Sequence, residues 1–400
     1  MSRMRIRTTL TSLALLLFIS LFANCGGSGR VKIDWTPVHA VNAVAPTVKV
    51  YIENSGSMDG YTCDGSQFKD AIHYIVNELD GYADTTELNF INSEVIPFSG
   101  DLNDFTLNLN PTSFQSYGGN RASSQLDVMF EKILKQMDDK TISVFTSDCI
   151  LGVPYGQTSH FLNIVSDNVK SVFAKHIKKH QDFGVEIFCL SSKFVGNYYQ
   201  YGQQPRKINC NRPYYVWFIG SQRLLGEMNK RIHLEKIPGS YLYEVGFSTC
   251  SSISFTITNE HGKSFGEGHS ESRVSNSKGT FIIKADLSST LQDDRTLCDM
   301  KNFMINPRTA LVKLESVESN ADADKDIFSH KITFKVFDKA HGIHPSIRVK
   351  TFDVPAWVGA MNDLSGSDMK KTQGIGFIIN GVASAFSDNS KIKGINFNIK

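Results

Sequence analysis

Along the first part of the chain, apolar residues occur with two different spacings, one typical of strands and one typical of helices. Short apolar runs, of which those at residues 48–52 and 104–109 alternate with period two, predict strands at residues 48–52, 88–91, 104–109, 141–146, 184–190 and 214–219. Between them, apolar residues recur every three or four positions and predict helices at residues 66–79, 123–137, 159–180 and 221–232. Strands that alternate with helices indicate an α/β domain, with a doubly wound, mostly parallel sheet covered on both faces. We expect this domain to occupy residues 46–235.

The spacing of apolar residues changes in the last part of the chain, where strand-type spacing predominates. Alternating apolar positions recur at residues 253–257, 281–283, 332–336 and 347–349, with turn-rich gaps and no helical spacing between them. Closely spaced strands of this kind predict a mainly β, sandwich-like C-terminal domain over residues 236–400. Helical spacing over residues 375–386 predicts one late helix, and the chain is expected to close on a strand near residues 395–399.

Composition adds two limits to this picture. The 400 residues, of which 41% are hydrophobic and 20% charged, are typical of a globular protein with more than one core. The formal net charge of +2 provides no general attraction to nucleic acid, so we expect no nucleic-acid partner.

The N-terminus carries the features of an export signal. Three arginines within the first seven residues precede an apolar run at residues 10–23, which is short for a membrane span and typical of a signal peptide. Cys25 and a glycine-rich stretch follow directly. This arrangement resembles a bacterial lipoprotein signal, in which the cysteine is lipidated and becomes the mature N-terminus.

The lipoprotein resemblance implies a signal peptide at residues 1–24, lipidation at Cys25 and a lipid-anchored tether at residues 25–45. It also implies a place in the cell envelope, attached to a bacterial membrane and facing either the periplasm or the surface. An ordinary cleaved signal peptide is the alternative.

Oxygen-bearing side chains follow two of the predicted strands. The strand at residues 48–52 runs into Glu53, Ser55 and Ser57, and the strand at residues 141–146 is followed by Asp148. In a parallel sheet the carboxyl ends of the strands form one edge, where ligands bind. Carboxylates and hydroxyls suit Mg²⁺, Mn²⁺ or Ca²⁺ better than a soft metal. The sequence therefore predicts a divalent-cation site at this edge.

The order of these residues resembles the metal-ion-dependent adhesion site of von Willebrand factor A (VWA) domains, Asp-x-Ser-x-Ser, with Glu53 in place of the Asp. The resemblance covers residues 46 to about 235. It implies that Ser55 and Ser57 contact the cation directly, that Glu53 acts through water, and that Asp148 supplies the last carboxylate.

The VWA family also uses a Thr from a second loop, and this chain has no direct counterpart. Residues 118–124 stand at the matching place, so Ser123 or Ser124 could supply the hydroxyl. Ser124 could instead cap the helix that follows, in a capping box with Asp127. Glu53 has an alternative of its own, a pairing with a neighbouring Lys or Arg without metal.

Other candidate sites are weaker. His176 and His180 have the spacing of a metal pair, but the lysines around them indicate a solvated basic helix face. Residues 322–326 imitate the start of an EF-hand loop, but Ile327 stands where glycine is needed, so we expect an acidic turn. Of the six cysteines beyond Cys25, Cys189 is predicted to be a buried free thiol, while export would permit disulfides among the others.

Three functions agree with these features. The VWA resemblance implies a lipid-anchored binding or adhesion protein, whose protein partner presents a carboxylate to the cation. The alternatives are a metal-free structural subunit of an envelope assembly and a metal-dependent hydrolase. No histidine is placed to serve as a base for the serines, so we expect binding and not catalysis.

Overall fold

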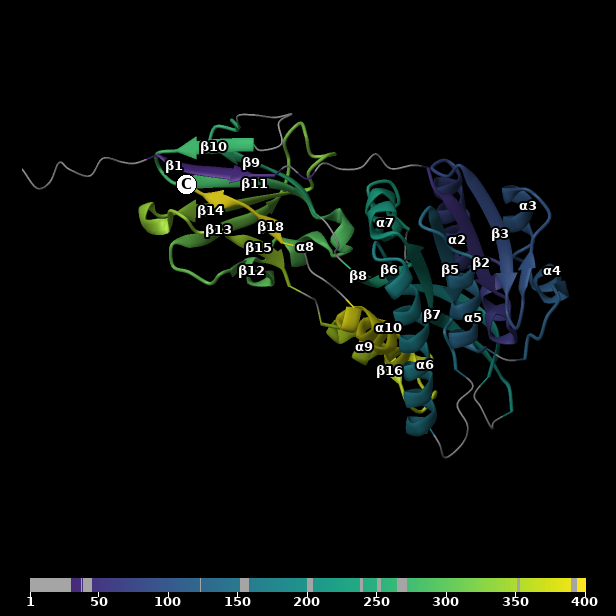
Figure 1. Ribbon diagram of the computed structural model, residues 1–400. Coiled ribbons are helices and arrows are strands. Elements are labelled where there is room, and N and C mark those ends of the chain that lie inside the picture. Colours follow the sequence, from purple (N-terminus) through teal and green to yellow (C-terminus); the bar gives the residue numbers. More distant parts are fainter. Residues whose placement is uncertain are drawn as a thin grey trace, which may run out of the picture.

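The computed structural model describes residues 30–36, 38, 45–122, 124–151, 158–199, 204–237, 240–249, 253–264, 272–350, 353–389 and 394–400. The predicted signal peptide and Cys25 lie outside these residues. The ribbon forms two bodies, an α/β body and a β module (Figure 1).

A seven-stranded mixed sheet forms the centre of the α/β body. Its strands, in spatial order, are β4 (Val95–Pro97), β3 (Thr85–Ile91), β2 (Thr47–Glu53), β5 (Thr141–Ser147), β7 (Arg206–Gly220), β6 (Gly184–Tyr198) and β8 (Tyr241–Ser248). The pairings of β2 with β3 and with β5 are parallel, and the other four pairings are antiparallel. The prediction of a mostly parallel sheet is therefore wrong. The antiparallel strands are β7, which lies between β5 and β6, and the two edge strands β4 and β8.

Helices cover both faces of this sheet, as predicted. One face packs against α5 (Leu126–Lys135), α6 (Thr158–Lys179), α9 (Ala356–Met361) and α10 (Ile375–Asn389). The other face packs against α2 (Gln67–Asp80) and α7 (Gln222–Asn229). Successive residues of β2 serve the two cores, since Tyr51 belongs to the first and Val50 and Ile52 to the second.

The strand expected at residues 104–109 is instead the short helix α3 (Leu102–Leu107), which α4 (Pro111–Ser116) follows. Asp101 caps α3, because its carboxylate accepts a hydrogen bond from the Asp104 N–H at 2.8 Å. The alternation that suggested a strand has no structural meaning here, since Leu107 is 73% exposed while Phe105 is buried.

The β module is built from three antiparallel sheets around one apolar core. The first contains β10 (Ser272–Asn276), β1 (Val31–Trp35) and β19 (Asn398–Ile399). The second contains β13 (Val312–Ser319), β14 (His330–Val336), β11 (Thr280–Asp286) and β9 (Ser254–Asn259). The third contains β12 (Phe303–Asn306), β15 (Ser346–Val349) and β18 (Ile395–Asn396). A mainly β part of the chain and a strand near its end were predicted, and both are present.

The limits of the two bodies differ from the predicted ones. Residues 31–35, expected within the tether, form β1 of the β module. Conversely, β8, α9 and α10 lie beyond residue 235 but belong to the α/β body, because β8 pairs with β6 and α10 packs on α6. Gly381 permits this close packing of α10, since a Cβ there would lie 2.5 Å from the Ser166 carbonyl oxygen.

The two bodies touch through the segment after β11, which contains the short turns η3 (Ser288–Thr290) and α8 (Asp294–Leu297). The Leu291 side chain is part of the α/β core. Its carbonyl oxygen lies so close to Gly246 of β8 that a Cβ on residue 246 would be only 1.8 Å from this oxygen. Lys230 of the α/β body forms an ion pair with Asp286 of the β module at 3.6 Å. The two bodies are therefore in direct contact along this segment.

Candidate functional site

The predicted cation site lies where two parallel strands end together. Glu53 is the last residue of β2, Ser147 is the last residue of the adjacent strand β5, and Asp148 follows Ser147 directly. After Glu53 the chain turns into a 3₁₀ helix, η1 (Gly56–Thr62), whose preceding residue Ser55 is extended. Strand register and this turn bring the four predicted residues Glu53, Ser55, Ser57 and Asp148 to one edge of the sheet.

Hydroxyl groups satisfy the carboxylate of Glu53. Its two oxygens accept hydrogen bonds from the Ser124 hydroxyl, at 2.5 Å, and from the Ser147 hydroxyl. Glu53 is fully buried. The alternative in which Glu53 pairs with a Lys or Arg is therefore wrong for the part of the chain that the structure describes.

A second chain of hydrogen bonds leads to Asp148. The hydroxyls of Ser55 and Ser57 lie 3.0 Å apart, and Ser57 donates to Asp148 Oδ1 at 3.2 Å. The Ile150 N–H donates to the same oxygen. Asp148 Oδ2 is buried and has no hydrogen-bond partner among the described residues. One carboxylate oxygen is thus left without a donor at the centre of the site.

Burial makes the negative charges of this site costly. Burial, and after it the negative charge of Glu53, raise the pKa of Asp148 to about 7. Burial also raises the pKa of Glu53, against the opposing effect of the serine hydroxyls that donate to it. Near neutral pH the pair therefore requires a compensating positive charge, which a proton or a metal ion can supply.

The loop after α4 supplies one expected hydroxyl. Ser123 lies outside the described residues, but Ser124 directs its hydroxyl to Glu53. The alternative in which Ser124 caps the next helix is wrong, because Gln125 occupies the N-cap position of α5 without a side-chain capping bond.

Arg121 holds this loop against the turn after β2. Its guanidinium donates to the carbonyl oxygens of Asn54, at 2.6 Å, and Ser55, and it forms an ion pair with Asp59. In return, the Gly56 N–H donates to the Arg121 carbonyl oxygen at 3.0 Å. The positive charge in this loop therefore fixes the backbone that carries Ser55 and Ser57.

Sequence reasoning missed a buried cation next to the site. Arg212 of β7 is 1% exposed, and its Nε and Nη2 have no hydrogen-bond partner among the described residues. Its guanidinium lies 4.5 Å from the centre of the Tyr198 ring, and Nη1 donates to the Met369 carbonyl oxygen at 3.3 Å. The positive charge of Arg212 lowers the pKa of Asp148. A single Arg before an aromatic strand gives no signal for this role.

Sequence reasoning also missed a second run with the same spacing, Asp363-Leu-Ser-Gly-Ser367. A search for the acid-x-Ser-x-Ser pattern alone would have found it. Its carboxylate accepts hydrogen bonds from the backbone N–H groups of Ser365, at 2.8 Å, and Asp368, at 2.9 Å. Tyr198 donates to the Gly366 carbonyl oxygen in the same loop. The Asp363 carboxylate is therefore hydrogen-bonded by the backbone of its own loop, which lies beside Arg212. Among the described residues, this loop has no counterpart of the buried Asp148 Oδ2 that lacks a donor.

The donor set of the first site fits a hard divalent cation. Two buried carboxylates and the hydroxyls of Ser55 and Ser57 provide oxygen ligands of the kind that Mg²⁺, Mn²⁺ and Ca²⁺ take. Among the described residues, no group of three or more His, Cys, Asp or Glu could hold a metal ion, so any cation here depends on the serines as well. Ser57 is 9% exposed and Ser55 2%, and access to the site is therefore narrow.

The other candidates have structural roles. His176 stacks on His180 at 4.3 Å and packs against Phe183, and burial lowers its pKa to about 4. Asp322 and Asp324 form ion pairs with Lys284, which confirms an acidic turn. Cys189 is buried and free, as predicted, and within the described residues the other free thiols are Cys63, Cys149, Cys210 and Cys298.

No protein-family model matches this chain, and no curated protein matches it either. In the part of the chain that the structure describes, no helix has both the length and the apolar character needed to cross a membrane.

Proposed function

We propose that this chain is a lipid-anchored, extracytoplasmic binding or adhesion protein with a VWA-like α/β domain, which engages a protein partner through a divalent cation. The cation would lie between Ser55, Ser57 and Asp148, with Glu53 behind them. The observation that supports the proposal most strongly is the buried Asp148 Oδ2, which has no donor among the described residues and lies next to a second buried carboxylate. A carboxylate from the partner would complete the cation's shell.

The lipid anchor and the envelope location rest on the N-terminal sequence alone. The charged start, the short apolar run and Cys25 support attachment to a bacterial membrane. We propose binding and not catalysis, because His73, on the helix that follows the serines, contacts Asn77 and Thr106 instead of the serine hydroxyls.

The proposal is tested by thermal unfolding with and without Mg²⁺, Mn²⁺ or Ca²⁺. A cation that binds only the folded state raises the free energy of unfolding, by about 2.7 kcal/mol at a concentration 100 times its Kd. Ser57→Ala removes a proposed ligand and should abolish this rise. Ser367→Ala is the matched control, since it alters the same position of the second Ser-Gly-Ser run and should leave the rise intact. If Ser367→Ala abolished the rise and Ser57→Ala did not, the cation would lie in the other loop.

A second candidate function is a metal-free structural subunit of an envelope assembly. The buried guanidinium of Arg212 favours it, because a nearby positive charge already offsets part of the charge on Asp148. If none of the three cations stabilises the wild-type protein, this second function replaces the first.

A further inference from the structure

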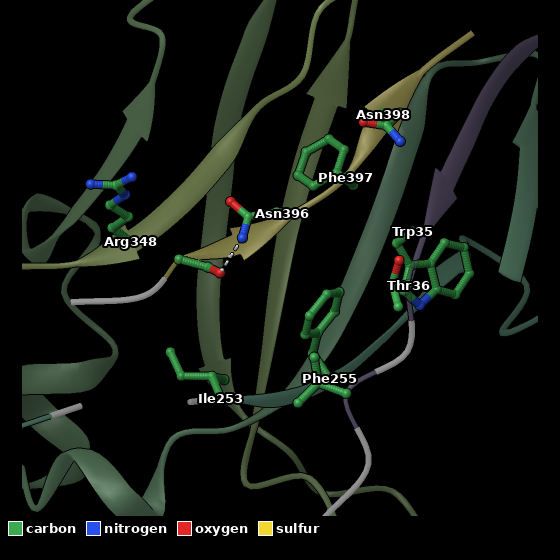
Figure 2. A pocket seen from close by; sticks show the side chains of 10 residues that line it. Trp35, Thr36, Ile253, Phe255, Arg348, Asn396, Phe397 and Asn398 are labelled. Atoms are coloured by element: carbon green, nitrogen blue, oxygen red, sulfur yellow. Dashed lines mark hydrogen bonds between the residues drawn. The ribbon is translucent and has the colours of Figure 1, made fainter. Parts of the chain in front are cut away.

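The β module, which does not carry the proposed cation site, contains a cavity of about 510 Å³ (Figure 2). The cavity lies between the end of β1, the start of β9 and the segment that joins β18 to β19. Its lining has a buried aromatic part, formed by Trp35, Phe255 and Phe397, and an exposed polar part that includes Asn396 and Asn398. A cavity of this size with apolar walls and a few polar groups is typical of a small-molecule site.

The backbone around the cavity is already hydrogen-bonded. The Phe255 N–H donates to the Val38 carbonyl oxygen at 3.2 Å, and the Phe397 N–H donates to the Pro345 carbonyl oxygen at 3.2 Å. These bonds fix two walls of the cavity before any ligand arrives, which lowers the entropic cost of binding. A ligand must therefore be recognised by the side chains that line the cavity.

Arg348 brings a positive charge to the cavity that no described carboxylate neutralises. Its side chain is half-buried, and its Nε donates to the Ser346 hydroxyl at 3.3 Å. Its two Nη groups have no partner among the described residues. The planar guanidinium presents these free N–H groups in the geometry that matches a carboxylate. Arg348 therefore favours a ligand with a carboxylate at this end of the cavity.

Trp35 supplies a second donor without an acceptor. It is 2% exposed, and its indole Nε1–H is buried with no acceptor in the described part of the chain. Figure 2 shows Arg348 and Trp35 at opposite ends of the cavity, with Phe255 and Phe397 between them and the indole nitrogen on the side of its ring nearer Phe255. Because a buried donor without an acceptor is unfavourable, a ligand oxygen at this end would be stabilising.

The two amides at the cavity are partly engaged with the protein itself. Asn396 Nδ2 donates to the Gly394 carbonyl oxygen at 3.0 Å, and Asn398 Oδ1 lies 2.7 Å from His344 Nδ1. Few groups remain that could bond the many hydroxyls of a sugar, and hydroxyls without partners next to aromatic rings are unfavourable. The lining instead suits a ligand whose polar atoms are concentrated at its two ends.

We propose that this cavity binds a small carboxylic acid that has an apolar chain and a neutral oxygen acceptor, such as an ester or a ketone, at the far end of the chain. The carboxylate pairs with the Nη groups of Arg348, and the chain lies against Phe255 and Phe397. The far oxygen accepts the hydrogen bond of Trp35 Nε1. This far group is neutral, because a single indole N–H cannot offset a second buried charge. The site is independent of the proposed cation site.

The test titrates monomethyl suberate, which has a carboxylate, a polymethylene chain and a methyl ester, into the full chain by calorimetry. We expect saturable binding to the wild-type protein. Arg348→Glu should weaken binding by at least about tenfold, because it places two like charges together. Arg308→Glu is the matched control, since Arg308 is exposed and does not line the cavity, and it should leave the affinity unchanged.

Two related compounds test the two ends of the ligand. The methyl ester of ω-aminooctanoic acid keeps the chain and the ester but carries an ammonium group, so it should bind the Arg348→Glu protein more tightly than the wild type. A variant that merely misfolded would bind neither compound. Suberate has a second carboxylate in place of the ester, and it should bind the wild-type protein at least about fivefold more weakly than the monomethyl ester does.

Three results would overturn the proposal. The first is the absence of saturable binding of monomethyl suberate to the wild-type protein. The second is equal affinity of the Arg348→Glu and Arg308→Glu proteins for this compound. The third is binding of suberate as tight as that of its monomethyl ester, which would contradict a neutral acceptor at Trp35. Binding of glucuronate in place of monomethyl suberate would replace the proposed ligand by a sugar acid.

Discussion

The substitution Asp148→Asn tests two things separately: how much the buried charge of Asp148 destabilises the fold, and whether Asp148 is needed for cation binding. Asparagine keeps the shape of the side chain and an oxygen that can accept from Ser57 and Ile150, as Oδ1 does now. It removes the negative charge that burial and Glu53 make unfavourable. In a metal-free solution the variant should therefore become more stable relative to wild type as the pH rises.

The size of this effect follows from the pKa of Asp148, which is raised from 3.8 to about 7. The folded state binds the proton more tightly than the unfolded state, so this group's contribution to stability is largest at low pH. It is lost as the pH rises from near 4 to about 7. Each pKa unit corresponds to about 1.4 kcal/mol, which gives a loss of about 3 kcal/mol between pH 5 and pH 8.

The measurement is urea unfolding in EDTA at several pH values between 5 and 8, for wild type and Asp148→Asn. The quantity of interest is the difference between the two free energies of unfolding, because groups that do not interact with Asp148, such as His176, change the absolute values equally in both proteins. Any constant cost of burying the new amide also cancels from the pH dependence of this difference. Stability should then be measured again at pH 8 with Mg²⁺, which should stabilise wild type and leave Asp148→Asn unchanged.

Glu186→Gln is the matched control. Glu186 is also buried, its Oε2 lacks a partner among the described residues, and burial raises its pKa to about 8. Its removal should also reduce the loss of stability at high pH, but it should not alter the response to Mg²⁺. If the difference between wild type and Asp148→Asn were the same at pH 5 and pH 8, the electrostatic account of this site would be refuted.

Three further predictions concern the site, the contact between the two bodies and the N-terminus. Glu53→Asp restores the acid of the VWA pattern and should keep or strengthen the stabilisation by a divalent cation, as measured by thermal unfolding. If a cation stabilised this variant and not the wild-type protein, the natural site would hold no metal. Gly246→Ala should lower the free energy of unfolding by at least about 2 kcal/mol, because its Cβ would meet the Leu291 carbonyl oxygen, whereas Gly359→Ala, with open space around it, should be neutral or stabilising in the same urea titration. Cys25→Ser should release the protein from the membrane fraction or block its maturation, and a variant that stays there with unchanged mobility on a gel would contradict lipidation.

The sequence was sufficient to bring the candidate site together. The β-branched runs before Glu53 and Asp148 were both recognised as strands, and both are buried. Because the two strands pair in parallel, as the sequence analysis expected, their carboxyl ends place both carboxylates at one edge. Local pattern and strand polarity therefore predicted that these side chains meet at one edge, whereas the loop that carries Ser124 was expected only from the VWA resemblance.

The parts that failed depend on contacts between distant segments. The position of β7 between β5 and β6 is set by pairing over the whole sheet, and no local pattern distinguishes it from a parallel strand. The helix at residues 102–107 is an exception, because its signal is local: Asp101 caps it, and the sequence analysis overlooked this cap. The body to which α10 belongs is decided by its packing on α6, and α10 follows a run of β strands in sequence. These choices are made by tertiary structure, for which a single sequence carries little signal.

The charges around the proposed cation site also indicate which ligand would suit it. Glu53 and Asp148 are both buried, and Arg212 is the buried cation beside them, so the three side chains together carry one excess negative charge when both acids are ionised. A single proton balances that charge, in agreement with the raised pKa of Asp148. A divalent cation would instead leave one excess positive charge in a region with little water. Such a charge is costly unless an anion accompanies it, and one carboxylate from a partner would restore neutrality. Arg212 thus supports a site whose cation is held best when an acidic partner is also bound, and this would couple the two binding events.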